Sequence, residues 1–219
     1  MAEQPAGQLV QVQAGPVTLD GDLAVPEGAR AIVLFAHGSG SSRLSPRNRH
    51  VAGVLRSAGL ATLLTDLLTR EEEEIDTRTA RLRFDIPLLA RRLVAVVDWL
   101  RRAPSTASLR VGLFGASTGA AAALIASAER PAVVGAVVSR GGRPDLAGAE
   151  VLGRVAAPTL LIVGALDAPV VRLNEAALEQ IRAQKELAIV PGASHLFEEP
   201  GALDHVARLA ALWFTRYVA

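Results

Sequence analysis

One serine of the chain, Ser117, stands in a pattern that is typical of a catalytic nucleophile. It is the third residue of a Gly-Ala-Ser-Thr-Gly motif, which follows the apolar run 111–114 and precedes the alanine-rich stretch 120–128. The pattern predicts a strand, a sharp turn and a helix, with the serine at the turn. Small residues on both sides allow the strained backbone that lifts the hydroxyl clear of the sheet edge. The chemistry that needs such a serine is acyl transfer through a covalent intermediate.

An aspartate and a histidine later in the chain complete a candidate catalytic triad. Asp167 follows the apolar run 159–163, and His195 follows the run 187–190. Because ligands of open α/β sheets bind outside the carboxyl ends of the strands, all three side chains are expected at one edge. His195 would accept the proton of Ser117 during attack and return it to the leaving group. Asp167 would hold the imidazole in the required tautomer.

Each partner of the serine also has a simpler interpretation. Asp167 could serve as a turn or helix-cap residue, and His195 could cap or hydrogen-bond its own loop. The strand positions, the chain order serine, aspartate, histidine, and a matching oxyanion segment all agree with one another. This agreement favours the triad.

Two backbone amides are candidates for an oxyanion hole, which the tetrahedral intermediates of acyl transfer require. One is the amide of Thr118, at the beginning of the helix that follows the serine. The other is the amide of Ser39, in a His-Gly-Ser-Gly segment just after the apolar run 31–35. The glycines on both sides of Ser39 allow this backbone to turn inward.

Three further polar residues follow predicted strands and are candidate substrate contacts. They are His37, Asp66 and Arg140. His37 could instead support its own loop, and Arg140 could either receive a substrate carboxylate or pair internally with an acid such as Asp145. The four histidines lack metal-ligand spacing and the chain has no cysteine, so we expect no metal site.

The elements that would position these residues alternate along the chain. Residues 10–12 and 17–25 predict an N-terminal hairpin on a sheet edge. Further strands are expected at 31–35, 61–64, 110–114, 133–138, 159–163 and 187–190. Helices are expected at 48–57, 85–102, 118–128, 171–183 and 203–217, the second of them capped by Asp85. This order predicts a single α/β domain over residues 1–219, with a mostly parallel, doubly wound sheet and helices on both faces.

Composition and charge argue against several classes of protein. Half of the residues are hydrophobic but only 4% are aromatic, which suits helix-on-sheet packing rather than stacking against bases. The 23 basic and 22 acidic residues nearly cancel, so no strong field draws the chain to nucleic acid or to a membrane. The N-terminus lacks a signal-peptide pattern, and no apolar stretch is long enough to span a bilayer. We therefore expect a soluble cytoplasmic protein that acts on a small molecule, and a homodimer stays open.

With these motifs the chain resembles the α/β-hydrolase superfamily, and within it the small dienelactone-hydrolase-like branch. The segments that carry the resemblance are 35–40, 115–119, 160–167 and 191–199. The resemblance implies an α/β-hydrolase fold with eight strands or slightly fewer, and a Ser-Asp-His hydrolase that needs no cofactor. Dienelactone hydrolases proper use cysteine as the nucleophile, whereas this chain has Ser117. Ordinary carboxylic esters are therefore a better expected substrate than dienelactone.

The connections between strands indicate how open the site is. Only residues 139–158 separate two predicted strands, which leaves no room for a large cap domain. Segment 66–84 could fold over the site as a partial lid, with Leu67, Leu68 and Ile75 facing the pocket, or it could be a surface loop. We expect a shallow or open site.

The expected activity is hydrolysis of small or medium carboxylic esters, lactones included, through a Ser117 acyl-enzyme. Two alternatives stay open. An acyltransferase or perhydrolase would pass the acyl group to an acceptor other than water. A non-catalytic interaction module would keep the fold without turnover, although such a module has no need of Ser117, Asp167 and His195 together.

Overall fold

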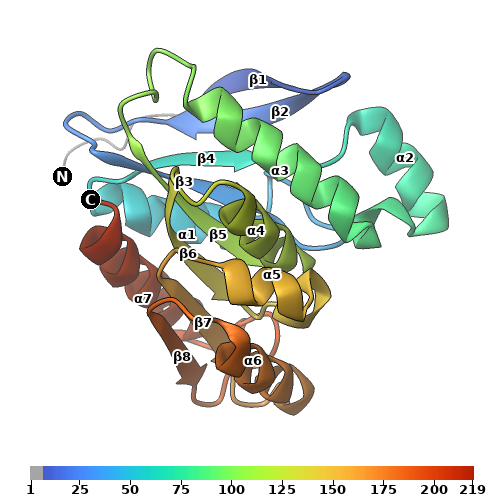
Figure 1. Ribbon diagram of the computed structural model, residues 1–219, viewed down its shortest axis with the longest axis vertical. Coiled ribbons are helices and arrows are strands. Elements are labelled where there is room, and N and C mark those ends of the chain that lie inside the picture. The colour runs from blue at the N-terminus through green and yellow to red at the C-terminus, as the bar shows by residue number, and fades with distance from the viewer. Residues whose placement is uncertain (1–6) are drawn as a thin grey trace.

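The computed structural model describes residues 7–219, which form an eight-stranded sheet covered by helices (Figure 1). The strand order is β1-β2-β4-β3-β5-β6-β7-β8. The strands are β1 (Gln8–Ala14), β2 (Val17–Ala24), β3 (Ala31–Ala36), β4 (Ala61–Thr65), β5 (Arg110–Ala116), β6 (Val134–Arg140), β7 (Thr159–Gly164) and β8 (Lys185–Val190). Strands β3 to β8 are parallel, and the hairpin β1–β2 joins one edge in antiparallel pairing. The predicted mostly parallel α/β architecture and its N-terminal hairpin are confirmed.

Helices cover both faces of the sheet. They are α1 (Pro46–Ser57), α2 (Arg70–Thr79), α3 (Ile86–Leu100), α4 (Thr118–Glu129), α5 (Ala149–Arg154), α6 (Ala168–Gln180) and α7 (Ala202–Tyr217), with short 3-10 helices η1 (Leu82–Phe84) and η2 (Pro144–Ala147). One hydrophobic core lies under α3 to α6, and a second core lies under α1 and α7. Among the helices that the structure describes, none is both long and apolar enough to cross a membrane.

Local sequence explains where two of the helices begin. The predicted cap of α3 is confirmed, because the Asp85 carboxylate accepts a hydrogen bond from the Leu88 amide at 2.9 Å. Helix α2 was not among the expected helices, although its signal stands in the sequence. Thr69 and Glu72 form a capping box, in which each side chain accepts a hydrogen bond from the other residue's amide.

The connections at the carboxyl edge of the sheet are short. Between β6 and β7 the chain forms only η2 and α5, so the expected absence of a large cap domain is confirmed. Helix α6 begins at Ala168, directly after Asp167 and three residues earlier than expected, because Pro169 is tolerated in a first helical turn.

Strand order decides which of these connections can meet. Strand β5, which leads to Ser117, lies between β3 and β6, and β7 and β8 follow on the β6 side. Strand β4 lies on the far side of β3, so the residues after it are separated from Ser117 by a whole strand.

Candidate active site

Ser117 stands at a strained turn between β5 and α4. Its backbone has φ 50° and ψ −120°, a combination that non-glycine residues rarely adopt. The Ser117 amide donates to the Arg140 carbonyl at 3.1 Å, and the Ser117 carbonyl accepts from the amides of Ala120 and Arg143, each at 3.1 Å. These three hydrogen bonds fix the backbone of Ser117 on both sides, so the surrounding structure stabilises its strained conformation.

The two glycines of the motif are required by close approach of neighbouring backbone. A Cβ on Gly119 would run into the carbonyl oxygens of Ala36 and His37, and one on Gly115 would run into the Cα of Ala120. Even a methyl group therefore cannot enter at either position without moving β3 or α4. This is the collision that the sequence motif predicts.

Asp167 and His195 come together at the ends of β7 and β8. The His195 Nδ1 atom lies 2.6 Å from Asp167 Oδ2, which is a short, charge-assisted distance. Gly164 lets the two loops approach, because a Cβ there would run into the carbonyl oxygen of Ala193. With Nδ1 directed at the carboxylate, the other ring nitrogen, Nε2, is free to act as a base.

The structure brings Ser117 and His195 into the lining of one cavity of about 210 Å³, which also includes Ser39 and Arg140. Among residues 7–219, no side chain or backbone group is hydrogen-bonded to the Ser117 hydroxyl. In apo enzymes the bond between nucleophile and base is often loose and tightens only when substrate is bound.

The two amides expected at the oxyanion hole come from two different segments near the nucleophile. Thr118 is the first residue of α4, so its amide has no acceptor within the helix. Ser39 belongs to the turn that follows β3, which we name the oxyanion turn after its expected role. This turn is closed by a hydrogen bond of 3.2 Å from the Ser41 amide to the Gly38 carbonyl. A Cβ on Gly38 would lie 3.1 Å from the Ser117 Cβ, so the turn passes close to the nucleophile.

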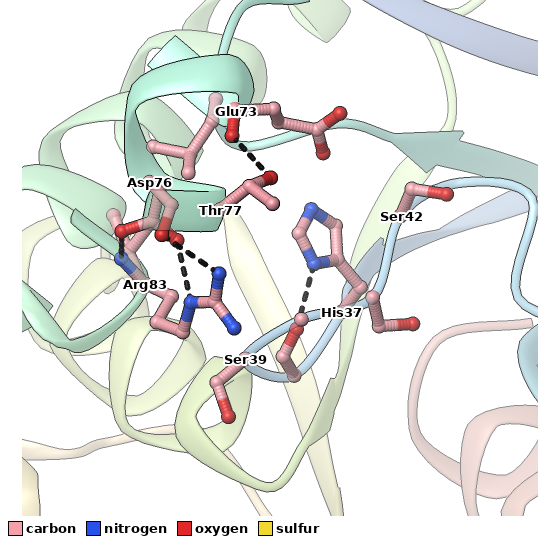
Figure 2. A pocket seen from close by; sticks show the side chains of 12 residues that line it. His37, Ser39, Ser42, Glu73, Asp76, Thr77 and Arg83 are labelled. Atoms are coloured by element: carbon pink, nitrogen blue, oxygen red, sulfur yellow. Dashed lines mark hydrogen bonds and ion pairs between the residues drawn. The ribbon is translucent and has the colours of Figure 1, made fainter. Parts of the chain in front are cut away.

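His37 supports this turn, as the alternative interpretation of its sequence position expects. Its Nδ1 lies 2.9 Å from the Gly38 carbonyl oxygen (Figure 2). Its Nε2 accepts a hydrogen bond from the Leu67 amide at 3.1 Å. Burial lowers the pKa of His37 below its ordinary value of 6.5, so the ring is neutral. Both nitrogens are used within the protein, and neither is left for a ligand.

Asp66 also lies outside the Ser117 cavity, because β4 is separated from β5 by β3. Its carboxylate accepts hydrogen bonds from Arg43, at 2.7 Å from the amide and 2.5 Å from the guanidinium. Asp66 thus anchors the chain after the oxyanion turn, and the structure does not bring it to Ser117.

Arg140 is the third expected contact, and it does line the cavity. It is the last residue of β6, only 7% exposed, and its Nε and Nη1 atoms have no hydrogen-bond partner among the described residues. Burial, together with the nearby cation of Arg47, lowers the pKa of Arg140 to about 10. The alternative of an internal pair with Asp145 is wrong, because Asp145 binds Arg143 through two hydrogen bonds of 2.8 Å.

One charged residue at the cavity, Arg47, was not among the expected ones. Arg47 lines the cavity from the first turn of α1 and donates to Glu198 at 3.0 Å. The expected helix began one residue too late to include Arg47. The positive charge of Arg47, in the segment that follows Ser39, was the only sign in the sequence. Its partner Glu198 lies 151 positions away, so the pairing could not be predicted.

The segment 66–84 covers the back of the oxyanion turn rather than Ser117. A second cavity, of about 420 Å³, lies between this turn and α2 (Figure 2). Leu68 lines this second cavity, Leu67 is buried in the core and Ile75 is 49% exposed. None of residues 66–84 lines the Ser117 cavity, so the expected partial lid over the nucleophile is not formed.

The chain matches known proteins over most of its length. A family model described as "Dienelactone hydrolase family" matches residues 19–217. A Mycobacterium tuberculosis protein named "Putative phosphoribosyl transferase" is 62% identical over 205 residues, which are 94% of this chain and 45% of that protein. The chain therefore spans less than half the length of this curated relative.

Solved structures give the same result. A dienelactone hydrolase from Anabaena variabilis is 64% identical, with a TM-score of 0.97 over 99% of this chain and 100% of that chain. Est1E from Butyrivibrio proteoclasticus shares the fold at 14% identity, with a TM-score of 0.80 over 96% of this chain and 98% of that chain. The family match and the 64% identity over the full length show that this chain belongs to the dienelactone hydrolase family, within the α/β-hydrolase fold.

Proposed function

We propose that the protein hydrolyses small or medium carboxylic esters, lactones included, through an acyl-enzyme on Ser117. Membership of the family shows that the protein is a hydrolase. The proposal adds the triad, the ester substrate and the oxyanion hole. The observation that carries them is the 2.6 Å contact between His195 Nδ1 and Asp167, at a cavity that the strained Ser117 also lines.

The reaction follows from the position of each group. Ser117 Oγ bonds to the acyl carbon while its proton passes to His195 Nε2, and the amides of Ser39 and Thr118 receive the oxyanion. When the intermediate collapses, the alkoxide leaves with the proton of His195. A water molecule then attacks the acyl-enzyme with His195 as base, and the carboxylic acid is released.

Asp167 has a distinct part in this scheme. Its carboxylate keeps the proton of His195 on Nδ1 and stabilises the imidazolium that forms during attack. The size of the cavity, about 210 Å³, supports small or medium acyl groups as substrates.

The test is covalent labelling with a fluorophosphonate, followed by intact-mass analysis and peptide mapping. Attack by an activated serine forms an oxygen–phosphorus bond and expels fluoride. We expect one adduct per chain, located on Ser117, and no adduct on the Ser117→Ala variant. Folded protein that stays unlabelled, or that carries the label on another residue, would contradict the proposal.

A second variant separates activation from mere exposure of the serine. Asp167→Asn keeps the shape of the side chain but no longer holds the imidazole tautomer, and we expect ester turnover to fall about ten-thousandfold. Labelling should slow in parallel. If Asp167→Asn turned over esters at the wild-type rate, the triad would be wrong even if Ser117 were labelled.

The acyltransferase or perhydrolase alternative uses the same acyl-enzyme and differs only in the acceptor. Product analysis with an added alcohol or peroxide distinguishes the two, since hydrolysis yields only the free acid. We assign no residue of this chain to phosphoribosyl transfer, because the relative with that name is more than twice as long as the part this chain matches.

A further inference from the structure

The loop that carries His195 depends on hydrogen bonds more than on burial for its shape. It is segment 191–201 between β8 and α7, and several of its residues are exposed to solvent, namely Pro191, Gly192, Leu196, Glu198 and Pro200. The contact with Asp167 fixes only one nitrogen of the ring. The direction of the other nitrogen, Nε2, is therefore set by the groups that hold the backbone beside His195.

Glu199 holds this backbone from the far end of the loop. Its Oε1 accepts a hydrogen bond of 3.0 Å from the amide of Ser194, the residue before His195. Hydrogen bonding from Ser194 lowers the pKa of Glu199 below its ordinary value of 4.5, so the acceptor is a charged carboxylate at neutral pH. The Glu199 carbonyl accepts from the Ala202 amide at 3.0 Å, which fixes Glu199 itself to the first residue of α7.

The backbone on either side of Ser194 is bonded as well. The Ser194 carbonyl accepts from the Phe197 amide at 3.3 Å, so residues 194–199 form a closed turn that contains His195. The Ala193 carbonyl accepts from the Leu166 amide at 2.9 Å, directly before Asp167. The turn that carries the base is therefore attached to the loop that carries the acid.

Phe197 has a strained backbone within this turn. Its φ of 57° lies in the left-handed region, which bulky residues rarely adopt, and its side chain is only 1% exposed. A Cβ on Gly141, just after β6, would lie 3.4 Å from the Phe197 ring and 3.1 Å from the His195 carbonyl oxygen. The turn thus packs against the end of the strand whose last carbonyl holds the Ser117 amide. Strain of this kind persists only where surrounding contacts fix it, and it is concentrated at functional sites.

We propose that Glu199 is a positioning residue, whose carboxylate fixes the turn 194–199 so that His195 keeps Nδ1 on Asp167 and presents Nε2 to Ser117. This inference rests on the proposed ester hydrolysis and adds a residue to the same site. Glu199 does not line the Ser117 cavity, so its loss misplaces the base and leaves substrate binding intact. Misplacing a reacting group by about 1 Å can cost about a hundredfold in rate.

Two substitutions separate the reach of the Glu199 side chain from its charge. Glu199→Gln keeps the length and an oxygen that accepts from the Ser194 amide, whereas Glu199→Asp keeps the charge but is one methylene shorter. With p-nitrophenyl acetate, we expect kcat to fall about ten- to a hundredfold in Glu199→Asp and less than about threefold in Glu199→Gln. KM should change less than about twofold in both. The reverse order of the two kcat values would show that the charge matters and the reach does not, and would overturn the proposal.

A spectroscopic signature distinguishes positioning from a merely structural role. The proton between His195 Nδ1 and Asp167 lies in a hydrogen bond of 2.6 Å, and such a short bond moves its proton NMR signal far downfield. We expect this signal in the wild-type protein and in Glu199→Gln, and its loss in Glu199→Asp that is folded by circular dichroism. If Glu199 only stabilised the fold, Glu199→Asp would lower the unfolding temperature but keep both the signal and kcat. That result would overturn the proposal.

Glu186 supplies the matched control. It is an exposed acid of β8, the strand that leads into the same loop. Glu186→Asp shortens a glutamate in the same way, and we expect it to leave kcat and the downfield signal unchanged. A fall in Glu186→Asp equal to that in Glu199→Asp would overturn the proposal. If Glu199→Asp does not fold, Glu199→Met replaces it, because methionine has a similar length but no oxygen to accept from Ser194, and the same losses are expected.

The downfield signal also keeps this inference separate from the proposed hydrolysis, because the signal requires no turnover. Failure of the fluorophosphonate to label Ser117 would overturn the hydrolysis, while loss of the signal in Glu199→Asp would still support the positioning of His195. Labelling of Ser117 together with an unchanged signal in Glu199→Asp would overturn the positioning role alone.

Discussion

At the scale of single residues, His37 holds the oxyanion turn in place without lining the Ser117 cavity. Its two ring nitrogens join the Gly38 carbonyl of the oxyanion turn to the Leu67 amide after β4. Only a neutral ring can donate on one side and accept on the other, and burial lowers the pKa of His37 accordingly. The residue that looked like a ligand contact therefore has a structural task.

This arrangement predicts a pH dependence of stability. Below pH 6.5 the unfolded chain takes up a proton on His37 that the folded chain refuses, so the free energy of unfolding falls as the pH falls. Between pH 7.5 and 5.5, urea unfolding should show that the wild-type protein loses about 1 kcal/mol more than His37→Asn. Asparagine retains a donor for Gly38 but does not titrate, and equal losses in the two proteins would contradict the assignment.

Arg140 and Arg143 illustrate what residue types cannot reveal. Both stand in one Ser-Arg-Gly-Gly-Arg segment near Asp145, and the sequence offers either as the partner of that acid. The 3-10 helix η2 begins at Pro144 and turns Asp145 back toward Arg143, while Arg140 is still part of β6. Arg143 is therefore paired with an acid, whereas two nitrogens of the Arg140 guanidinium have no partner among the described residues.

At the scale of elements, the turn from β5 to α4 depends on the contact of Gly119 with β3. A methyl group at Gly119 would run into the carbonyl oxygens of Ala36 and His37, at the point where the oxyanion turn begins. We expect Gly119→Ala to lower the free energy of unfolding by about 1 to 3 kcal/mol and to slow labelling of Ser117.

Gly153 supplies the matched control for that substitution. It lies in α5, and a Cβ there would have no neighbour within 4 Å. Gly153→Ala should raise the free energy of unfolding by up to about 1 kcal/mol, because alanine favours helix, and should leave labelling unchanged. Chemical denaturation of both variants gives the comparison, and a Gly119→Ala protein as stable as Gly153→Ala would refute the steric argument.

Helix α2 shows how far a helix can be predicted from the sequence. The capping box of α2 is a local signal that could have been recognised, since Thr69 and Glu72 have the required spacing. The position of α2 behind the oxyanion turn could not have been predicted from the sequence. It depends on the Asp76–Arg83 ion pair and on packing against residues far away in the chain. Figure 2 shows Asp76 bonded to Arg83 on the α2 side of the cavity, across from His37.

At the scale of the whole molecule, the central strands serve two cores at once. In β3, Ile32 and Leu34 belong to the core under α3 to α6, whereas Val33 and Phe35 belong to the core under α1 and α7. Side chains alternate between the two faces of a strand, so both cores are built on the same strands. Opening one core exposes one face of the sheet on which the other core is packed. We therefore expect the two layers to unfold together.

The two tryptophans report on one core each. Trp99 of α3 packs against the first core, and Trp213 of α7 is buried in the second, where its indole donates to the Pro158 carbonyl. In Trp99→Phe and in Trp213→Phe, the urea transition of the remaining tryptophan should coincide with that seen by circular dichroism. A fluorescence midpoint displaced from the circular dichroism midpoint of the same variant would indicate that one layer opens independently.

The sequence by itself determined the alternation of strands and helices, the elbow at Ser117, the cap at Asp85 and the hydrolase family, because these depend on periodicity and on motifs within a few residues. Only the tertiary structure decided which polar residues after the strands meet. The strand order places Asp66 on the far side of β3 from Ser117. Arg140 is buried with two guanidinium nitrogens unpartnered among the described residues, and Arg47 of α1 lines the same cavity. The physical reason is that a side chain's partner and its loss of water are set by segments far away in the chain, which no local pattern encodes.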